Sequence, residues 1–168
     1  HASFLLDNVE FTELWKGALA IKDSSGEAVR NFFKKDYSIM NLIWGLRLKV
    51  YYGMSKSEII QNLFHVTEKA SPSDPICGEV FKILDKDISN FSDWCDWKYS
   101  RFLNPNEEGV VWQIDPVWVE EKFRSEEVEK AFQIFHQNPL TIGSVVMFFR
   151  LKQQELNCIR TVTESIRL

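Results

Sequence analysis

The sequence IMNLIWGLRLK, residues 39–49, lies inside a long and regular apolar pattern. Over residues 26–52, apolar side chains recur at spacings of three and four, which places them along one face of a helix. They are Val29, Phe32, Phe33, Tyr37, Met40, Ile43, Trp44, Leu48 and Tyr51. The pattern predicts one continuous amphipathic helix over residues 26–52, and we expect Gly53 to end it.

A second stretch, IGSVVMFFRLK at residues 142–152, is similar to the first. Both end in Arg-Leu-Lys, and the two arginines are 103 positions apart (150 − 47). The same offset superposes Ile142 on Ile39 and Phe135 on Phe32. Copies of one helical unit are typical of scaffold proteins. Two explanations stay open here: duplication of an ancestral helix, or chance likeness between two apolar helices.

Proline and capping residues mark further helix starts. A side chain that can cap a helix precedes a proline at Asp74-Pro75, Asp115-Pro116 and Asn138-Pro139, and proline is favoured at the first helical position. The sequence Ser55-Lys56-Ser57-Glu58 matches a capping box and predicts a helix over residues 55–67.

The remaining segments also favour helices. We predict a last helix over residues 139–166, buried in its first half through Phe149, and one or two helices over residues 76–103. The short β-like run at residues 110–114 follows Gly109 and is interpreted as a loop. The predicted fold class is therefore all-α, built from long antiparallel helices.

Composition and charge restrict the classes of function. The 168 residues are 45% hydrophobic and 14% aromatic, enough to fill a core. The net charge of −4 argues against nucleic-acid binding, which needs clustered Lys and Arg. Residues 30–49 hold five basic residues and one acidic, whereas residues 107–130 hold eight acidic and three basic. This asymmetry suits docking to a charged protein partner, although solvated helix faces would also explain it.

No motif for metal binding or membrane insertion is present in the sequence. The three cysteines lack metal-ligand spacing to one another and to the histidines, and their odd number fits a reducing, cytosolic compartment. The longest uncharged stretches, residues 37–46 and 137–149, are well short of the roughly 20 residues that cross a bilayer. Because the chain begins at His1 rather than Met, we expect an N-terminal portion to be absent.

The sequence predicts no catalytic residues and no cofactor site. The paired carboxylates Glu107-Glu108 and Glu120-Glu121 have no His, Cys or Ser motif beside them, and the seven glycines form no phosphate-binding loop. A small helical enzyme that uses the acids of residues 107–130 remains an alternative.

The middle of the chain is rich in aromatic residues. Exposed tryptophans often anchor protein interfaces, so Trp94, Trp97, Trp112 and Trp118 are candidate interface residues. Core filling is the alternative explanation.

Two segments resemble the central-stalk subunit of V-type and A-type ATPases, named C in prokaryotes and d in eukaryotes. The sequence DYSIMNLIWGLRLK at residues 36–49, followed by Gly53 and Ser55, is similar to the family's "asparagine, aliphatic, Leu-Arg-x-Lys" helix. The sequence FFRLKQQELNCIR at residues 148–160 is similar to its closing helix, although Cys158 stands where the family usually has asparagine. The resemblance covers residues 26–66 and 126–168 and leaves out the tryptophan-rich middle.

This resemblance implies a non-catalytic rotor subunit of a V/A-type ATPase. The family forms a funnel of three pseudo-repeated helical domains, which sits on the membrane proteolipid ring, receives the rotor shaft and transmits torque for ATP-coupled ion transport. The chain would be about the C-terminal half, with helical repeats at residues 1–68 and 69–168, and would lie on the cytoplasmic face of the membrane. The alternative is an unrelated helical scaffold that binds a protein partner through its aromatic and acidic middle.

Polar residues interrupt the apolar pattern of the two similar helices. Buried polar side chains need hydrogen-bond partners. We therefore expect Asn41 and Arg47 to bond to neighbouring helices and fix their register, with Glu155 and Arg160 acting similarly in the last helix.

Overall fold

The computed structural model describes residues 2–22, 24–137 and 142–167. Every regular element in these ranges is helical, and none is a strand, so the all-α prediction is confirmed. The α-helices are α1 (Ala2–Ala20), α2 (Ser24–Val50), α3 (Lys56–Gln61), α4 (Gly78–Leu84), α5 (Pro116–Gln137) and α6 (Ile142–Arg167), and the short 3₁₀ helices are η1 (Phe91–Trp94) and η2 (Ser100–Phe102).

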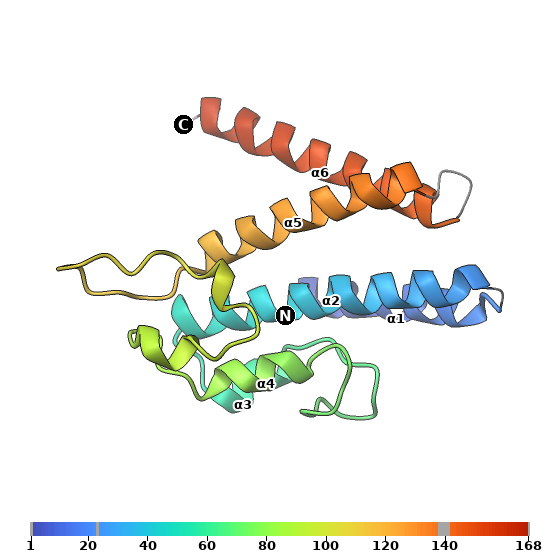
Figure 1. Cartoon of the computed structure of the whole chain (residues 1–168). Coiled ribbons are helices and arrows are strands. Elements are labelled where there is room, and N and C mark those ends of the chain that lie inside the picture. The colour runs from blue at the N-terminus through green and yellow to red at the C-terminus, as the bar shows by residue number, and fades with distance from the viewer. Residues whose placement is uncertain (1, 23, 138–141, 168) are drawn as a thin grey trace.

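Helix α2 lies at the centre of the molecule. It runs antiparallel to α1, and α5 and α6 form a second antiparallel pair (Figure 1). The short helices α3 and α4 pack on one side of α2, and α5 packs on another. The predicted pairs of long antiparallel helices are therefore present.

The main apolar core surrounds the C-terminal half of α2. Leu42 and Leu46 of α2 are almost fully buried against residues of α3, of α4, of the tryptophan-rich segment at residues 94–112 and of the start of α5. A second cluster joins Phe11 of α1 to Tyr37, Phe64 and Ile76. The main cluster contains residues from both sides of residue 68, and the division into repeats at 1–68 and 69–168 stays a prediction.

A glycine lets α4 approach the middle of α2. A Cβ atom built on Gly45 would lie 2.8 Å from Cγ1 of Val80, closer than a real Cβ contact allows. Val80 is fully buried at this point. The crossing of α2 and α4 therefore depends on the absence of a side chain at residue 45.

The predicted central helix is confirmed to within two residues at each end. Gly53 adopts a left-handed conformation, with φ +57°, and the N–H of Met54 donates to the carbonyl of Leu48 at 3.1 Å. This arrangement satisfies carbonyls at the end of the helix. Gly53 terminates α2 as expected.

The capping box at Ser55 is confirmed, but the helix that it begins is shorter than predicted. The side chain of Ser55 accepts from the N–H of Glu58, and Glu58 bonds back to the N–H of Ser55. Helix α3 ends at Gln61 instead of continuing to residue 67. The backbone N–H groups of Phe64 and Thr67 instead donate to the side chains of Asn41 and Asp74. Side chains from outside α3 thus replace the bonds that another helical turn would have made.

The prediction of one or two helices over residues 76–103 is largely wrong. Only α4, η1 and η2 are helical there, and turns connect them. Polar side chains such as Asn90 and Asp93 bond to nearby backbone groups, which competes with helix formation. Residues 110–114 form a loop, as expected.

Helix α5 begins at Pro116 as predicted, and the N–H of Val117 donates to Asp115 at 2.9 Å. The expected start at Asn138-Pro139 lies outside the described residues. The prediction that the first half of the last helix is buried is wrong for Val145, Phe148 and Phe149, which are exposed.

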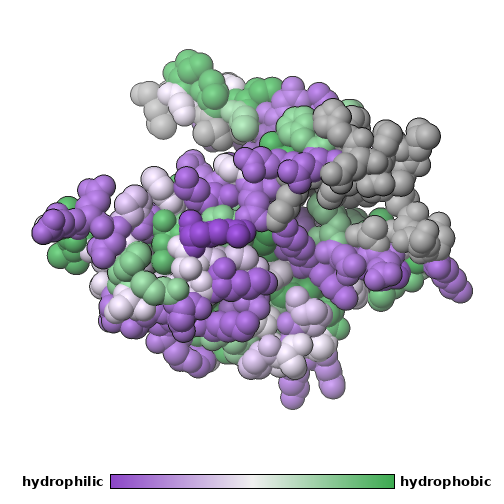
Figure 2. All heavy atoms as spheres, in the orientation of Figure 1, coloured by the Kyte–Doolittle hydropathy of each residue, from purple (hydrophilic) through white to green (hydrophobic). Residues whose placement is uncertain are grey.

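Further apolar residues are exposed on α6. Ser144 is buried, whereas the C-terminal part of the helix leaves hydrophobic residues on the surface, as Figure 2 shows at the top of the molecule. Among the described residues, no helix has the length and apolar character that crossing a bilayer would require.

Candidate functional site

Asn41 lies in the middle of α2 and is completely buried. Its Nδ2 donates to the carbonyls of Phe64 (2.8 Å) and Ile76 (3.3 Å), and its Oδ1 accepts from the N–H of Phe64 at 2.9 Å. Both ends of the amide are therefore used. The side chain attaches the loop after α3 and the turn before α4 to the central helix. We expected a partner on a neighbouring helix, but the partners lie in these loops.

Arg47 lies six residues further along α2 and connects it to α5. Its guanidinium donates to Oε2 of Glu120, and Arg124 donates to the other oxygen of the same carboxylate at 3.0 Å. All three side chains are partly buried. Charge-assisted bonds of this kind fix the position of one helix on another. Arg47 thus makes the contact with a neighbouring helix that its place in the sequence suggested.

Lys49 connects α2 to the end of α4. Its Nζ donates to the carbonyls of Ile83 and Leu84, both at 2.8 Å, and to that of Lys86. The last carbonyls of a helix lack partners within the helix. A positive charge there also interacts favourably with the negative end of the helix dipole. Burial lowers the pKa of the Lys49 ammonium, while nearby aspartates such as Asp85 act in the opposite direction.

Lys49 was not among the predicted site residues. It is the last residue of the Leu-Arg-x-Lys motif, so the motif itself was the signal. The role of this lysine depends on α4, whose position the sequence does not reveal.

Asp74 organises the loop that Asn41 holds. Its Oδ2 accepts from the backbone N–H groups of Val66 and Thr67, both at 2.9 Å, and from the Thr67 hydroxyl. Its Oδ1 accepts from the N–H groups of Ile76 (2.8 Å) and Cys77 (3.0 Å). Burial by itself raises the pKa of this carboxyl, but the hydrogen bonds outweigh it and lower the pKa to about 2.

The sequence identified Asp74 only as a helix cap before Pro75. The structure agrees in part, because Asp74 bonds to the turn that leads into α4, which begins three residues after Pro75 at Gly78. Its bonds to residues 66 and 67 have no sequence signal.

These contacts form one attachment site along α2, which we call the α2 anchor: Asn41, Arg47 and Lys49. Each side chain joins a different part of the molecule to the same helix: the loop organised by Asp74, the helix α5, and the end of α4. Asn41, Arg47 and Lys49 therefore each bond α2 to a segment outside that helix, through backbone carbonyls or a carboxylate.

The other two predicted polar residues lie elsewhere. Glu155 is exposed and pairs with Lys152 of its own helix at 2.7 Å, so it does not reach a neighbouring helix. Arg160 is also exposed on α6. The expectation that these two residues act like Asn41 and Arg47 does not match their positions, because the face of α6 that carries them is open to solvent.

Three of the four candidate interface tryptophans lie in the core. Trp94, Trp97 and Trp112 are at most 6% exposed, which leaves them unable to contact a partner in this structure. Core filling, the alternative explanation, describes them. Trp118 at the start of α5 is 36% exposed, and its interface role stays a prediction.

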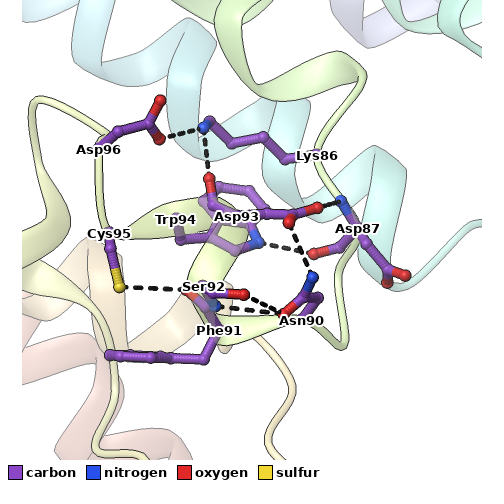
Figure 3. Close-up of polar contacts among 9 residues, drawn as sticks. All are labelled: Lys86, Asp87, Asn90, Phe91, Ser92, Asp93, Trp94, Cys95 and Asp96. Atoms are coloured by element: carbon purple, nitrogen blue, oxygen red, sulfur yellow. Dashed lines mark hydrogen bonds and ion pairs between the residues drawn. The ribbon is translucent and has the colours of Figure 1, made fainter.

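A dense polar network holds the buried Trp94. Its Nε1 donates to the carbonyl of Asp87 at 2.7 Å, and Lys86 bridges the carbonyl of Asp93 and the carboxylate of Asp96 (Figure 3). Asn90 and Asp93 bond to each other on the other side of the turn. The network stabilises a compact turn, and all its members have structural partners.

The paired carboxylates do not converge. Glu107 and Glu108 lie exposed on a loop, whereas Glu120 bonds to Arg47, and Glu121 is exposed on α5. In the described ranges, no group of three His, Cys, Asp or Glu residues is placed to hold a metal ion. Burial raises the pKa of the Cys77 thiol to about 11, which makes it a poor nucleophile.

The chain is similar to a known protein family over nearly its whole length. The family model described as the ATP synthase (C/AC39) subunit matches residues 3–168. An uncharacterized protein of Treponema pallidum (strain Nichols) is 25% identical over 166 residues, which cover 96% of the chain and 47% of the relative. The chain thus spans about half the length of the curated relative that it matches. No solved structure matches the chain.

Proposed function

The chain belongs to the ATP synthase (C/AC39) subunit family, the central-stalk family of V/A-type ATPases, and from this premise we propose that it is part of a non-catalytic rotor subunit. In this role it links the rotor shaft to the proteolipid ring of the membrane and transmits torque between them. The family membership carries the proposal, and it removes the basis for the alternative of an unrelated scaffold.

The α2 anchor supports a mechanical role. A part that transmits torque has to resist relative movement of its helices, and a closely packed interior transmits strain. Helix α2 is attached through side-chain bonds to a loop, to α4 and to α5, in addition to its apolar contacts. Twist applied to one of these parts would therefore reach the others with little slippage.

We also propose the surroundings of the subunit from its family. It lies on the cytoplasmic side of the membrane, peripheral to the bilayer, in a complex of different subunits. Its helices contribute to a funnel-like array of helical repeats, with repeats at residues 1–68 and 69–168.

Assembly with purified partners tests the proposal. The full-length protein would be immobilised and incubated at low salt with the purified shaft subunits and, separately, with the detergent-solubilised proteolipid ring of the same organism. We expect both to be retained. Failure of both to bind, with a protein that gives a helical circular dichroism spectrum, would contradict the proposed function.

A further inference from the structure

The loop at residues 104–114, which we call the projecting loop, has a firmly built base. The side chain of Asn104 donates to the carbonyl of Gln113 and accepts from the N–H of Asp115, both at 2.9 Å. Trp112 and Ile114 are buried, and the N–H of Ile114 donates to the carbonyl of Ile88 at 3.0 Å. These contacts fix where the loop leaves the protein.

The tip of the projecting loop is a turn that exposes apolar side chains. Gly109 has φ +82°, and the N–H of Val110 donates to the carbonyl of Glu107 at 3.3 Å. The following residues, Val110 and Val111, are 62% and 89% exposed. In Figure 1 the loop extends beyond the helices, and in Figure 2 hydrophobic and hydrophilic residues lie side by side at its end. The fold gains nothing from holding two valines in water.

More apolar surface lies where α2 ends and α5 begins, beside the base of the loop. Tyr51 and Tyr52 after α2 are exposed, as are Val117 and Trp118 at the start of α5. The Tyr51 hydroxyl donates to Oδ1 of Asp115 at 3.4 Å, which brings the two helix ends together. The loop tip and the helix ends thus provide apolar contact area at one end of the molecule.

The charges on this end are mainly negative. Glu107, Glu108 and Glu121 are exposed, and in the part of the chain that the structure describes no salt bridge joins a basic side chain to any of them. Lys122 lies over the ring of Trp118, 5.0 Å from its centre. A partner that covers the valines would therefore meet carboxylates around an apolar centre, and charge complementarity selects a basic partner.

We propose that the projecting loop and the adjoining helix ends form a docking surface for another protein subunit that presents Lys or Arg side chains around an apolar patch. The identity of that subunit as a rotor component rests on the proposed function. A membrane surface is the other kind of partner that an apolar tip could meet. The carboxylates disfavour it, since the cytoplasmic leaflet is negatively charged.

Binding measurements with the full-length protein test this surface. The probes are the purified shaft subunits, the proteolipid ring in detergent, and vesicles of phosphatidylcholine with phosphatidylglycerol. The variants are V110S/V111S, which removes the apolar tip, and E107K/E108K, which reverses its charge. The control V9S/L19S changes two other exposed apolar residues, both on α1. Circular dichroism and thermal unfolding would check that each variant folds.

We expect V110S/V111S to weaken binding to one of the two protein probes by about tenfold, since a few central apolar contacts dominate most interfaces. We expect E107K/E108K to weaken the same binding at low salt and to approach the wild type at high salt, because exposed charges are screened. V9S/L19S should bind like the wild type.

Two results would overturn this inference while leaving the proposed function intact. One is wild-type affinity of both loop variants for both protein probes. The other is loss of vesicle binding in V110S/V111S with protein binding unchanged, which would make the loop a lipid contact. If the wild-type protein binds neither protein probe, the proposed function fails, and the assignment of a rotor partner to this surface fails with it.

Discussion

Asn41 and Asp74 show how single buried polar residues decide the course of the chain between α3 and α4. Together they accept or donate bonds for backbone groups of residues 64, 66, 67, 76 and 77. Apolar burial alone would leave these groups without partners, and each unpaired buried group costs stability. The loop is thus specified by one side chain of its own, Asp74, and by one from the distant helix α2, Asn41.

Replacing Asn41 by alanine should destabilise the protein. The substitution removes three buried hydrogen bonds, two of them to backbone groups of Phe64 and one to the carbonyl of Ile76, which we expect to cost about 2–4 kcal/mol. Urea unfolding followed by circular dichroism measures the change. Asn31 on the same helix is exposed, and N31A should change the free energy of unfolding by less than about 0.5 kcal/mol. Equal losses in the two variants would contradict the assigned role.

Asp74 should make the folded state sensitive to acid. Its pKa is about 2 in the folded protein and lies below the ordinary value of 3.8, so the folded state favours the ionised form. The resulting stabilisation is fully present above the unfolded pKa and is lost as the pH falls from about 4 towards 2, by roughly 2 kcal/mol. Unfolding free energies of the wild type and D74N, measured from pH 6 to pH 2, should converge as the pH falls. If the two free energies instead differ by the same amount at every pH, Asp74 is not the source of the acid sensitivity.

At the scale of elements, the sequence predicts a helix end well where neighbouring residues determine it, and poorly where bonds from other segments do. Helix α2 and the start of α5 were predicted because the apolar spacing, Gly53 and Pro116 are local signals. The end of α3 was missed because the bonds that replace its next turn come from Asn41 and Asp74. The candidate site was predictable to the same extent. The sequence indicates Asn41 and Arg47 as polar residues in an apolar pattern, but their partners depend on how distant segments pack.

Two pairs of charges test how α5 is attached to α2. A double-mutant cycle with R47M and E120Q should give a coupling energy of about 1 kcal/mol or more, because the pair is partly buried. The more exposed pair Lys56 and Asp85, probed with K56M and D85N, should give less than about 0.5 kcal/mol. Similar coupling in both cycles would mean that the contact between α2 and α5 has no special strength.

The close crossing of α2 and α4 depends on Gly45. We expect G45A to destabilise the fold by about 1–3 kcal/mol, since its methyl group would overlap Val80. In contrast, a Cβ on Gly17 of α1 meets nothing within 4 Å, and G17A should stabilise the protein by up to about 1 kcal/mol. Thermal unfolding compares the two, and the double variant G45A/V80A should recover part of the loss if the overlap is its cause. A G45A variant as stable as the wild type would show that α4 can move away freely.

At the scale of the whole molecule, the arrangement of the helices supports the proposed role as a mechanical coupler. Two antiparallel helix pairs and a small helical layer are tied to one central helix, and the charged and apolar loop extends from one end (Figure 1). The family, in turn, belongs to an ATP-driven rotary complex. The proposed role concerns how movement passes between subunits, so it is measured in the assembled complex.

The ratio of ions moved to ATP hydrolysed tests the proposed coupling role most directly. The purified ATPase complex of the same organism would be rebuilt in vesicles with and without the full-length protein, and both rates would be recorded. We predict that complexes lacking the protein hydrolyse ATP but move no ions, and that adding the protein restores ion uptake. Ion uptake coupled to hydrolysis at the normal ratio in its absence would contradict that role.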